Sequence, residues 1–370
     1  MNQEITDPTD ALKGGFHLPK SFVRWVAVGL VLSTAVIIII SLISGVKFSD
    51  FERIGFLSFG LCAAASAVRL LVQIERFRVI TVGLAENPKM DLSGLALTRV
   101  SSEFISISTP ASGTGVFLRT AWLSGKGVTA GKALWIGYFE VLIEVYVGCT
   151  LGFGAAAYAF LKGAVLLGST ISVISLVVIT GYTILFIIPA RRAIKIPHFV
   201  FTIAKYLVGG PKATALYLNA VVGSVNFSVS ARAILTRSKI PVALKAVALT
   251  VIENLLDGVA LWFVLNAAGL KIDPLLSTIV VFGVDTITQL PISIGGAGIT
   301  EVTMQGYLTT VFGFSSWASI VIWRVATYQV LLAITGIVFL FFVRKNTSHA
   351  EKPREVKSQK DINDSLKDRK

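Results

Sequence analysis

The stretch RTAWLSGKGVTAGKALWIGYFEVLIE (Arg119–Glu144) has a counterpart further along the chain, RAILTRSKIPVALKAVALTVIENLLD (Arg232–Asp257). Charges of the same sign recur at five positions, each 113 residues after its counterpart: Arg119 and Arg232, Lys126 and Lys239, Lys132 and Lys245, Glu140 and Glu253, Glu144 and Asp257. Such a register in a chain poor in charge predicts an internal duplication, with repeat units at about 92–161 and 213–267.

The spacing within each copy has a physical meaning. Glu140 and Glu144 are one helical turn apart, as are Glu253 and Asp257, so each pair shares one face of its helix. We call these two couples the acid pairs. Eight residues separate Lys132 from Glu140, which is about 12 Å along a helix axis. A lysine at the membrane surface therefore predicts carboxylates deep in the hydrocarbon, where a charge indicates a functional site.

Composition indicates the class of protein. The mean hydropathy is +0.75, and 54% of the residues are hydrophobic while 15% are charged. Ordinary soluble domains have about 25% charged residues. Several apolar runs exceed the roughly 20 residues that a helix needs to cross a bilayer. We predict an all-α polytopic membrane protein.

The net charge of +13 does not indicate nucleic acid as a partner. Nine Lys/Arg fall between Arg344 and Lys370, and most others flank apolar segments. This distribution is the positive-inside pattern, and it predicts that both termini are cytoplasmic. Cys62 and Cys149 lie in apolar runs and are predicted to be packing residues. The histidines are too scattered for a metal site, so we expect no metal and no cofactor.

We expect a single transmembrane domain at 21–345, between a disordered N-terminus (1–20) and a basic tail (346–370). Two segments with basic flanks, 92–126 and 213–235, are predicted to be re-entrant hairpins, and 196–208 an interfacial helix. About eight transmembrane helices are expected, at 23–46, 54–80, 130–161, 165–189, 241–265, 274–291, 299–312 and 317–343. In the second of them, the run Glu75–Arg78 is expected to be a basic edge in the cytoplasm.

The acid pairs have several possible roles. They could bind the cationic part of a lipid headgroup, relay protons, or neutralise Arg119 and Arg232; in the structural alternative they form buried salt bridges that tie each span to its hairpin. A planar guanidinium suits a phosphate group. We therefore predict that Arg119 and Arg232 each hold a lipid phosphate at a hairpin tip.

The run LPISIGGAGITE (Leu290–Glu301) is rich in proline and glycine and leads directly into a helix. Free N–H groups at a helix start, with glycines that allow close approach, favour an anion. We predict that Ser293, Gly295 and Gly296 bind an anion or headgroup. The earlier run PASGTG (110–115) is similar, and it makes Ser112 and Gly113 candidates too. The alternative is that these glycines only let helices pack closely.

Glu301 and Arg324 lie on adjacent antiparallel segments. Counted from the turn between them, their depths differ by about 5 Å. We predict a buried structural ion pair, in which each single substitution is more harmful than the double one.

Motifs of soluble enzymes are absent from the sequence. There is no Gly-Lys-Ser/Thr phosphate loop, no HExxH, no Gly-x-Ser-x-Gly and no extramembrane segment long enough for a catalytic domain. The sequence therefore does not predict an enzyme or any catalytic residue.

At Leu290–Glu301 the chain resembles the flippase-type transmembrane domain of lysylphosphatidylglycerol synthetase, whose motif Leu-Pro-Ile-Ser-x-Gly-Gly-x-Gly-x-x-Glu it matches nearly letter for letter. The family's Glu-Arg-x-x-Asp helix is similar to Glu253–Asp257, with Asn254 in place of arginine. The segment from Pro110 to Arg119 resembles the family's hairpin motif, but this chain lacks the acidic residue that is usual there. The likeness covers about residues 20–345.

This resemblance implies a lipid-handling protein of the plasma membrane that moves a phospholipid or isoprenoid-phosphate lipid between leaflets. The family's soluble aminoacyl-transferase domain is not in this chain, so a separate lipid-synthesising or glycosyltransferase enzyme is an expected partner. Two alternatives are a membrane-embedded transferase acting on a lipid, and a non-transporting partner subunit of a lipid synthase.

Overall fold

A computed structural model describes residues 20–85, 90–109, 114–191, 225, 227–232, 236–290 and 293–350, and within these ranges it contains helices and no strand. The all-α prediction is therefore confirmed. Several predictions lie outside the described residues: the interfacial helix at 196–208, most of the second hairpin at 213–235, Ser112 and Gly113, and nearly all of both termini.

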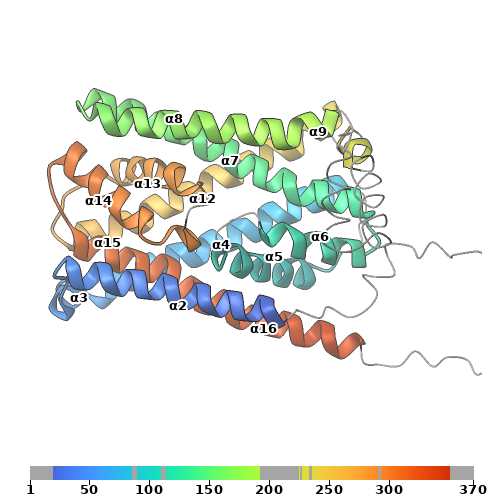
Figure 1. Cartoon of the computed structure of the whole chain (residues 1–370), viewed down its shortest axis with the longest axis horizontal. Helices are drawn as coiled ribbons and strands as arrows, with labels where there is room; N and C mark the ends of the chain where they lie inside the picture. Colours follow the sequence, from blue (N-terminus) through green and yellow to red (C-terminus); the bar gives the residue numbers. More distant parts are fainter. Residues whose placement is uncertain are drawn as a thin grey trace, which may run out of the picture.

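Five helical segments are long and apolar enough to cross a membrane, and most of them run along the long axis of the molecule (Figure 1). They are α4 (Phe56–Ala85), α7 (Ala130–Leu161), α8 (Val165–Tyr182) with the π-helical turn η2 (Thr183–Ile187), the 3₁₀ turn η3 (Arg237–Lys239) with α12 (Ile240–Ala267), and α15 (Trp317–Arg324) with the π-helical turn η5 (Val325–Gln329) and α16 (Val330–Ala350). α9 (Ile188–Arg191) extends η2. The chain is therefore a multi-pass membrane protein.

A sixth span forms if α2 (Lys20–Ile43) and α3 (Phe48–Ile54) are taken together, although they meet at an angle of 92°. Gly45 and Gly55 flank α3 with positive φ values of 66° and 82°. Only glycine adopts this backbone region readily, so these positions allow the chain to turn sharply on both sides of the short helix.

The predicted eight crossings are not confirmed. The two predicted crossings that are not among the membrane-length helices lie between residues 274 and 312. There α13 (Pro274–Thr288) and α14 (Ile299–Phe312) have 15 and 14 residues, fewer than the about 20 that span a bilayer. α5 (Leu92–Ile107) and α6 (Gly115–Gly125) are also short, with 16 and 11 residues. In Figure 1 the first pair occupies the left half of the bundle and the second pair the right half.

The two short pairs meet inside the bundle. The Tyr328 hydroxyl donates to the carbonyl of Ile107, at the end of α5, over 3.0 Å. The 3₁₀ turn η4 (Ile294–Gly296), which lies between α13 and α14, also contacts α5. The turn between α13 and α14 therefore lies against α5, and polar backbone groups at such breaks need protein partners at membrane depth.

Glycines hold α13 close to its two neighbours. A Cβ atom on Gly152 of α7 would overlap the Thr286 hydroxyl, and one on Gly258 of α12 would overlap Thr278. Small residues at helix contacts allow the backbones to approach closely. α13 is thus fixed between the two helices that carry the acid pairs.

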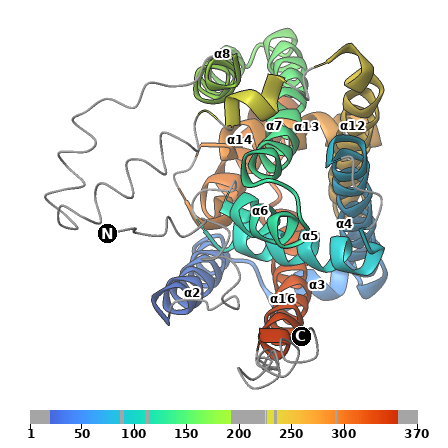
Figure 2. The same cartoon turned by 90° about the vertical axis from the view of Figure 1, so that its right-hand side faces the viewer.

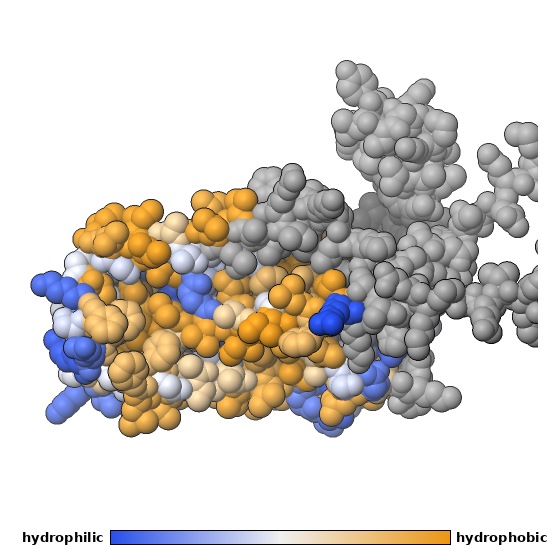
Figure 3. All heavy atoms as spheres, turned by 90° about the horizontal axis from the view of Figure 1, so that it is seen from below, coloured by the Kyte–Doolittle hydropathy of each residue, from blue (hydrophilic) through white to orange (hydrophobic). Residues whose placement is uncertain are grey.

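The surface of the molecule agrees with a protein that spans a membrane. An end view places α8 on one side of the bundle and α2 and α16 on the opposite side (Figure 2). The view from below shows a broad apolar band, with hydrophilic residues concentrated toward the ends and a small recessed hydrophilic patch within it (Figure 3). An apolar belt of this kind is suited to contact with lipid tails.

Candidate functional site

One face of α4 carries three polar side chains at helical spacing, Arg69, Gln73 and Arg76. The Arg69 guanidinium donates to the Asp257 carboxylate over 2.9 Å, and the Gln73 amide donates to Glu253. This face therefore packs against the acid pair of α12.

Arg76 joins three helices. Its side chain is fully buried and pairs with Glu253 of α12 at 2.5 Å, with Glu140 of α7 at 3.3 Å, and with Glu144 of α7. It also donates to the Thr250 hydroxyl over 3.0 Å. The two acid pairs, which are far apart in the sequence, thus share one arginine.

Glu140 is the most enclosed of the acids. Its exposed fraction is 0%, and it accepts from Arg76, from Arg99 of α5 at 3.0 Å, and from Arg119 of α6. Arg99 also binds Glu103, one turn further along α5, at 2.7 Å. Three cations around one carboxylate replace the water that it loses on burial.

We call these nine side chains the ion network: Arg69, Arg76, Arg99, Arg119, Glu103, Glu140, Glu144, Glu253 and Asp257. Four arginines face five carboxylates, so the network carries one excess negative charge when every group is ionised. An unpaired charge at membrane depth is costly. This excess makes the network suited to a positively charged group.

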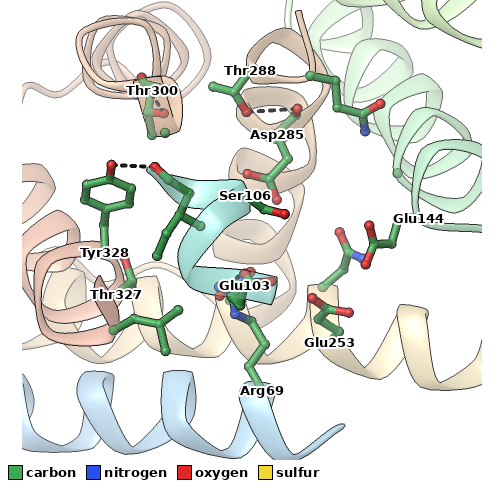
Figure 4. A pocket seen from close by; sticks show the side chains of 18 of the residues that line it. Arg69, Glu103, Ser106, Glu144, Glu253, Asp285, Thr288, Thr300, Thr327 and Tyr328 are labelled. Atoms are coloured by element: carbon green, nitrogen blue, oxygen red, sulfur yellow. Dashed lines mark hydrogen bonds and ion pairs between the residues drawn. The ribbon is translucent and has the colours of Figure 1, made fainter. Parts of the chain in front are cut away.

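A cavity of about 290 Å³ lies beside the ion network. Glu144, Glu253 and Asp257 line it, together with Arg69 and Glu103, whereas Glu140, Arg76, Arg99 and Arg119 lie behind its wall. Figure 4 shows Glu144 and Glu253 on one side of the cavity and Thr300 and Tyr328 on the other. Both charged and hydroxyl groups thus surround the same space.

The second wall is formed by the loop before α14. Ser293, Gly295 and Gly296 line the cavity, and the Ser293 hydroxyl has no hydrogen-bond partner among the described residues. Gly295 has a φ of +56°, and a Cβ atom there would overlap the Tyr328 ring and hydroxyl. Glycine is therefore required at this position by both backbone conformation and space.

Glu301 and Arg324 form the predicted ion pair, with Nε and Oε1 2.9 Å apart. Arg324 also donates to the Gly295 carbonyl and stacks over the Tyr328 ring, 4.2 Å from its centroid. Glu301 accepts from the backbone N–H of Gly298 over 2.6 Å. One of the N–H groups at the helix start, which was predicted to bind an external anion, is therefore already bonded within the protein. The purely structural role of the pair stays a prediction, because Arg324 also lines the cavity.

Asp285 of α13 also lines the cavity, and its side chain points inward (Figure 4). The hydrogen bond that joins Thr288 to this residue is accepted by the Asp285 main-chain carbonyl, not by the carboxylate. Among the described residues, the Asp285 carboxylate takes part in no hydrogen bond or ion pair.

The predicted phosphate-binding arginines lie elsewhere. Arg119 is buried, pairs with Glu140, and does not line the cavity. Arg232 is exposed and donates to the Arg191 carbonyl over 2.5 Å. In this arrangement Arg119 neutralises a buried acid, which is the structural alternative, and Arg232 does not repeat that contact.

Sequence reasoning missed the central role of Arg76. The run Glu75–Arg78 was predicted to be a cytoplasmic edge, yet Arg76 is fully buried while Glu75 and Arg78 pair at the surface. The reason is that α4 continues to Ala85. The spacing of Arg69, Gln73 and Arg76 on one face was a signal that could have identified all three.

These features define a class: a helical, multi-pass membrane protein with a polar cavity inside its bundle. A sequence model of the lysylphosphatidylglycerol synthase TM region matches residues 24–336. The chain therefore belongs to that family, as the resemblance of its motifs predicted. No curated protein and no solved structure matches it. Family and fold together make it a membrane-embedded, lipid-related protein.

Proposed function

We propose that this protein moves the polar head of a membrane lipid, a phospholipid or an isoprenoid phosphate, from one leaflet to the other. The observation that carries the proposal is the cavity: charges of both signs and several hydroxyl groups gather inside a bundle of membrane-length helices. A lipid head loses its water when it enters the bilayer. Polar side chains that replace this water lower the barrier to its passage.

The size of the cavity agrees with this function. Its volume of about 290 Å³ is at the lower end of the range for small-molecule pockets. The space suits a headgroup and is too small for acyl chains as well. The head would occupy the cavity while the tails stay in the surrounding lipid, against the apolar band of the surface.

The two walls supply different chemistry. Arg324 and the Ser293 hydroxyl support binding of a phosphate, because a guanidinium and a hydroxyl without a partner among the described residues can both donate to its oxygens. Gly295 and Gly296 line the same wall. Across the cavity, Glu253 and Asp257 would act as counter-charges for a cation or as proton acceptors. In this proposal the protein acts in the plasma membrane, with a separate enzyme that supplies or uses the lipid.

The test is lipid movement in proteoliposomes that contain the full chain. Tail-labelled phosphatidylglycerol, phosphatidylethanolamine and an isoprenoid phosphate are followed separately by quenching of the outer leaflet. We expect the wild-type protein to accelerate movement of at least one of them and Glu253→Gln to slow it about tenfold or more, because the variant loses a charge that faces the cavity. Glu75→Gln, a surface change of the same chemical kind, is the matched control.

If the wild-type protein moves none of these lipids, the proposal is wrong. Chemical modification of a lipid in the same vesicles would then favour a membrane-embedded transferase. Restored activity of a co-reconstituted lipid synthase would favour a partner subunit. A slowing by Glu75→Gln equal to that by Glu253→Gln would show that the cavity is not the site.

A further inference from the structure

Tyr328 lies where three parts of the cavity wall meet. It belongs to the π-helical turn η5, is 5% exposed and lines the cavity. Its hydroxyl donates to the Ile107 carbonyl at the end of α5 over 3.0 Å, which Figure 4 marks with a dashed line. Its ring lies against the loop before α14, where a Cβ atom on Gly295 would overlap it. One side chain therefore joins α5, this loop and the last span.

The π-helical turn accounts for this placement. The N–H of Val330 bonds the carbonyl of Val325, five residues earlier, so the turn contains one residue more than an α-helical turn, and such turns are frequent at functional sites. Arg324 comes four residues before Tyr328 and lies on the same face. Its Cζ atom is 4.2 Å from the centroid of the Tyr328 ring. Stacking on an aromatic ring fixes the plane of the guanidinium.

Arg324 has one donor nitrogen to spare. Its side chain is 9% exposed, Nε lies 2.9 Å from Glu301 Oε1, and Nη2 donates to the Gly295 carbonyl. Within the described residues, Nη1 makes no hydrogen bond or ion pair, although Asp285, which lines the same cavity, attracts the guanidinium. A guanidinium donor that is buried without such a partner is suited to an anionic oxygen that enters the cavity.

We propose that Tyr328 is a positioning residue: its ring holds the plane of Arg324 so that Nη1 is presented to the phosphate oxygens of the bound lipid. The Tyr328 hydroxyl proton is used by Ile107 and one ring face by Arg324, so the residue acts through its neighbours. The inference rests on the proposed function and assigns one residue a specific part in it. An arginine without the ring would carry the same charge without the fixed direction.

The test measures binding separately from movement. The purified full chain in detergent is titrated with dioctanoyl phosphatidylglycerol, whose head has one phosphate and no other charge, and binding is followed by the rise of the unfolding midpoint. Tyr328→Leu removes the ring, and we expect it to weaken binding about tenfold. Tyr328→Phe keeps the ring beside Arg324 and removes only the hydroxyl, so its affinity should stay within about twofold of the wild-type affinity.

A double variant distinguishes positioning from packing. Arg324→Lys keeps a positive charge beside Glu301 but has no plane for a ring to fix. In this background, Tyr328→Leu should change the affinity by less than about twofold, because the two residues act as one unit. If Tyr328→Leu weakens binding equally in both backgrounds, the ring acts through the fold and the inference is wrong. It is also wrong if Tyr328→Phe weakens binding as much as Tyr328→Leu.

Tyr158→Leu is the matched control. Tyr158 of α7 also has a cation over its ring, with Lys162 Nζ 5.6 Å from the ring centroid, but it does not line the cavity. Its replacement should leave binding of phosphatidylglycerol unchanged. A loss of affinity equal to that of Tyr328→Leu would show that any lost aromatic contact weakens binding, and it would overturn the inference.

The outcomes separate this inference from the proposed function. If the wild-type protein binds phosphatidylglycerol but moves none of the lipids in vesicles, lipid movement is wrong, while the variants still decide the role of Tyr328. If it binds dioctanoylglycerol, which lacks the phosphate, equally well, the inference is wrong even where a lipid is moved. Glycerol phosphate, which has no tails, should bind at least about tenfold more weakly, because it buries no apolar surface. Equal binding would overturn the lipid as the source of the phosphate.

Discussion

The two acid pairs have the same spacing and different surroundings. Glu140 of α7 is fully enclosed by Arg76, Arg99 and Arg119, whereas Glu253 and Asp257 of α12 both line the cavity. Glu144, one turn from Glu140, has a side chain that is 35% exposed and reaches the same cavity. One carboxylate is thus enclosed by arginines, and the other three face the cavity.

The different surroundings of the two acid pairs show that a charge pattern in the sequence does not by itself distinguish an acid enclosed by arginines from one that faces a cavity. Identical spacing places the acids on matching helix faces, but the neighbours of each face decide what it contacts. The α7 pair meets arginines from α4, α5 and α6. Among the described residues, the ion pairs of the α12 pair are with α4, and both of its carboxylates also line the cavity.

Arg76→Met should give the largest loss of stability. The change leaves Glu140, Glu144 and Glu253 close together with one cation fewer, and removal of one partner from a buried charge network costs about 3–5 kcal/mol. The measurement is the unfolding midpoint of the purified protein in detergent. Arg78→Met, two residues further at an exposed position, should change stability by less than about 0.5 kcal/mol. Equal effects of the two changes would contradict the central role of Arg76.

Glu140→Gln and Asp257→Asn test the comparison directly. Glu140→Gln leaves Arg119 without its acid, and we expect it to destabilise the protein by about 2 kcal/mol. Asp257→Asn should cost less stability, because it also relieves repulsion with Glu253 and Asp285, and it should slow lipid movement more. The two variants are compared by unfolding in detergent and by transport in vesicles. If Asp257→Asn were the more destabilising change and Glu140→Gln slowed lipid movement more, Asp257 would have the structural role and Glu140 the role in transport.

Gly295→Ala tests the opposite wall of the cavity. The positive φ and the contact with Tyr328 predict a destabilisation of about 1–3 kcal/mol together with slower lipid movement. Gly306→Ala is the control, because a Cβ atom there meets nothing within 4 Å. Alanine inside α14 should stabilise the protein by about 0.5–1 kcal/mol. An unchanged midpoint for Gly295→Ala would show that the loop adjusts easily.

The exposed pair of Asp91 and Lys126 should have the smallest effect. Their side chains are 46% and 41% exposed and lie 2.9 Å apart. The hydrogen bond from Lys126 lowers the pKa of Asp91 from 3.8 to about 2. A lowered pKa in the folded state means that the stabilisation is present above about pH 4 and is lost as the pH falls toward 2.

Asp91→Asn keeps the cap on α5 and removes the charge. Its midpoint should therefore differ slightly from the wild-type midpoint at pH 6 and coincide with it near pH 2. The difference at pH 6 should also shrink at high salt, because exposed ion pairs are screened. A difference that grows on acidification would contradict the assigned sign.

Long apolar runs made much of the fold predictable. The third predicted span, 130–161, coincides with α7, and 241–265 lies within α12. The acid pairs were identified because a charge in an apolar helix is conspicuous. Ser293, Gly295 and Gly296 were identified because they lie in a run rich in proline and glycine directly before a helix. All three line the cavity. Their binding of a phosphate stays a prediction.

Other features depend on contacts between distant segments and could not be predicted in this way. The segment 274–291 is apolar like the spans, so hydropathy alone does not show that α13 ends at Thr288 after 15 residues. α14 is less apolar and has 14 residues. Arg119 and Arg232 look equivalent in sequence, but within the described ranges Arg119 pairs with a buried acid and Arg232 bonds a main-chain carbonyl. Asp285 was not among the predicted site residues, because its place at the cavity depends on contacts between distant helices.

The ion network has a mechanical consequence. Its arginines and acids fasten α4, α5, α6, α7 and α12 to one another through charge contacts, and separating them would expose several uncompensated charges at once. These five helices should therefore move as a rigid body. If the protein moves lipids as proposed, the cavity would widen outside this group, on the side where α2 meets η4 and α15. A crosslink there should then arrest the protein, while one across the network should be tolerated.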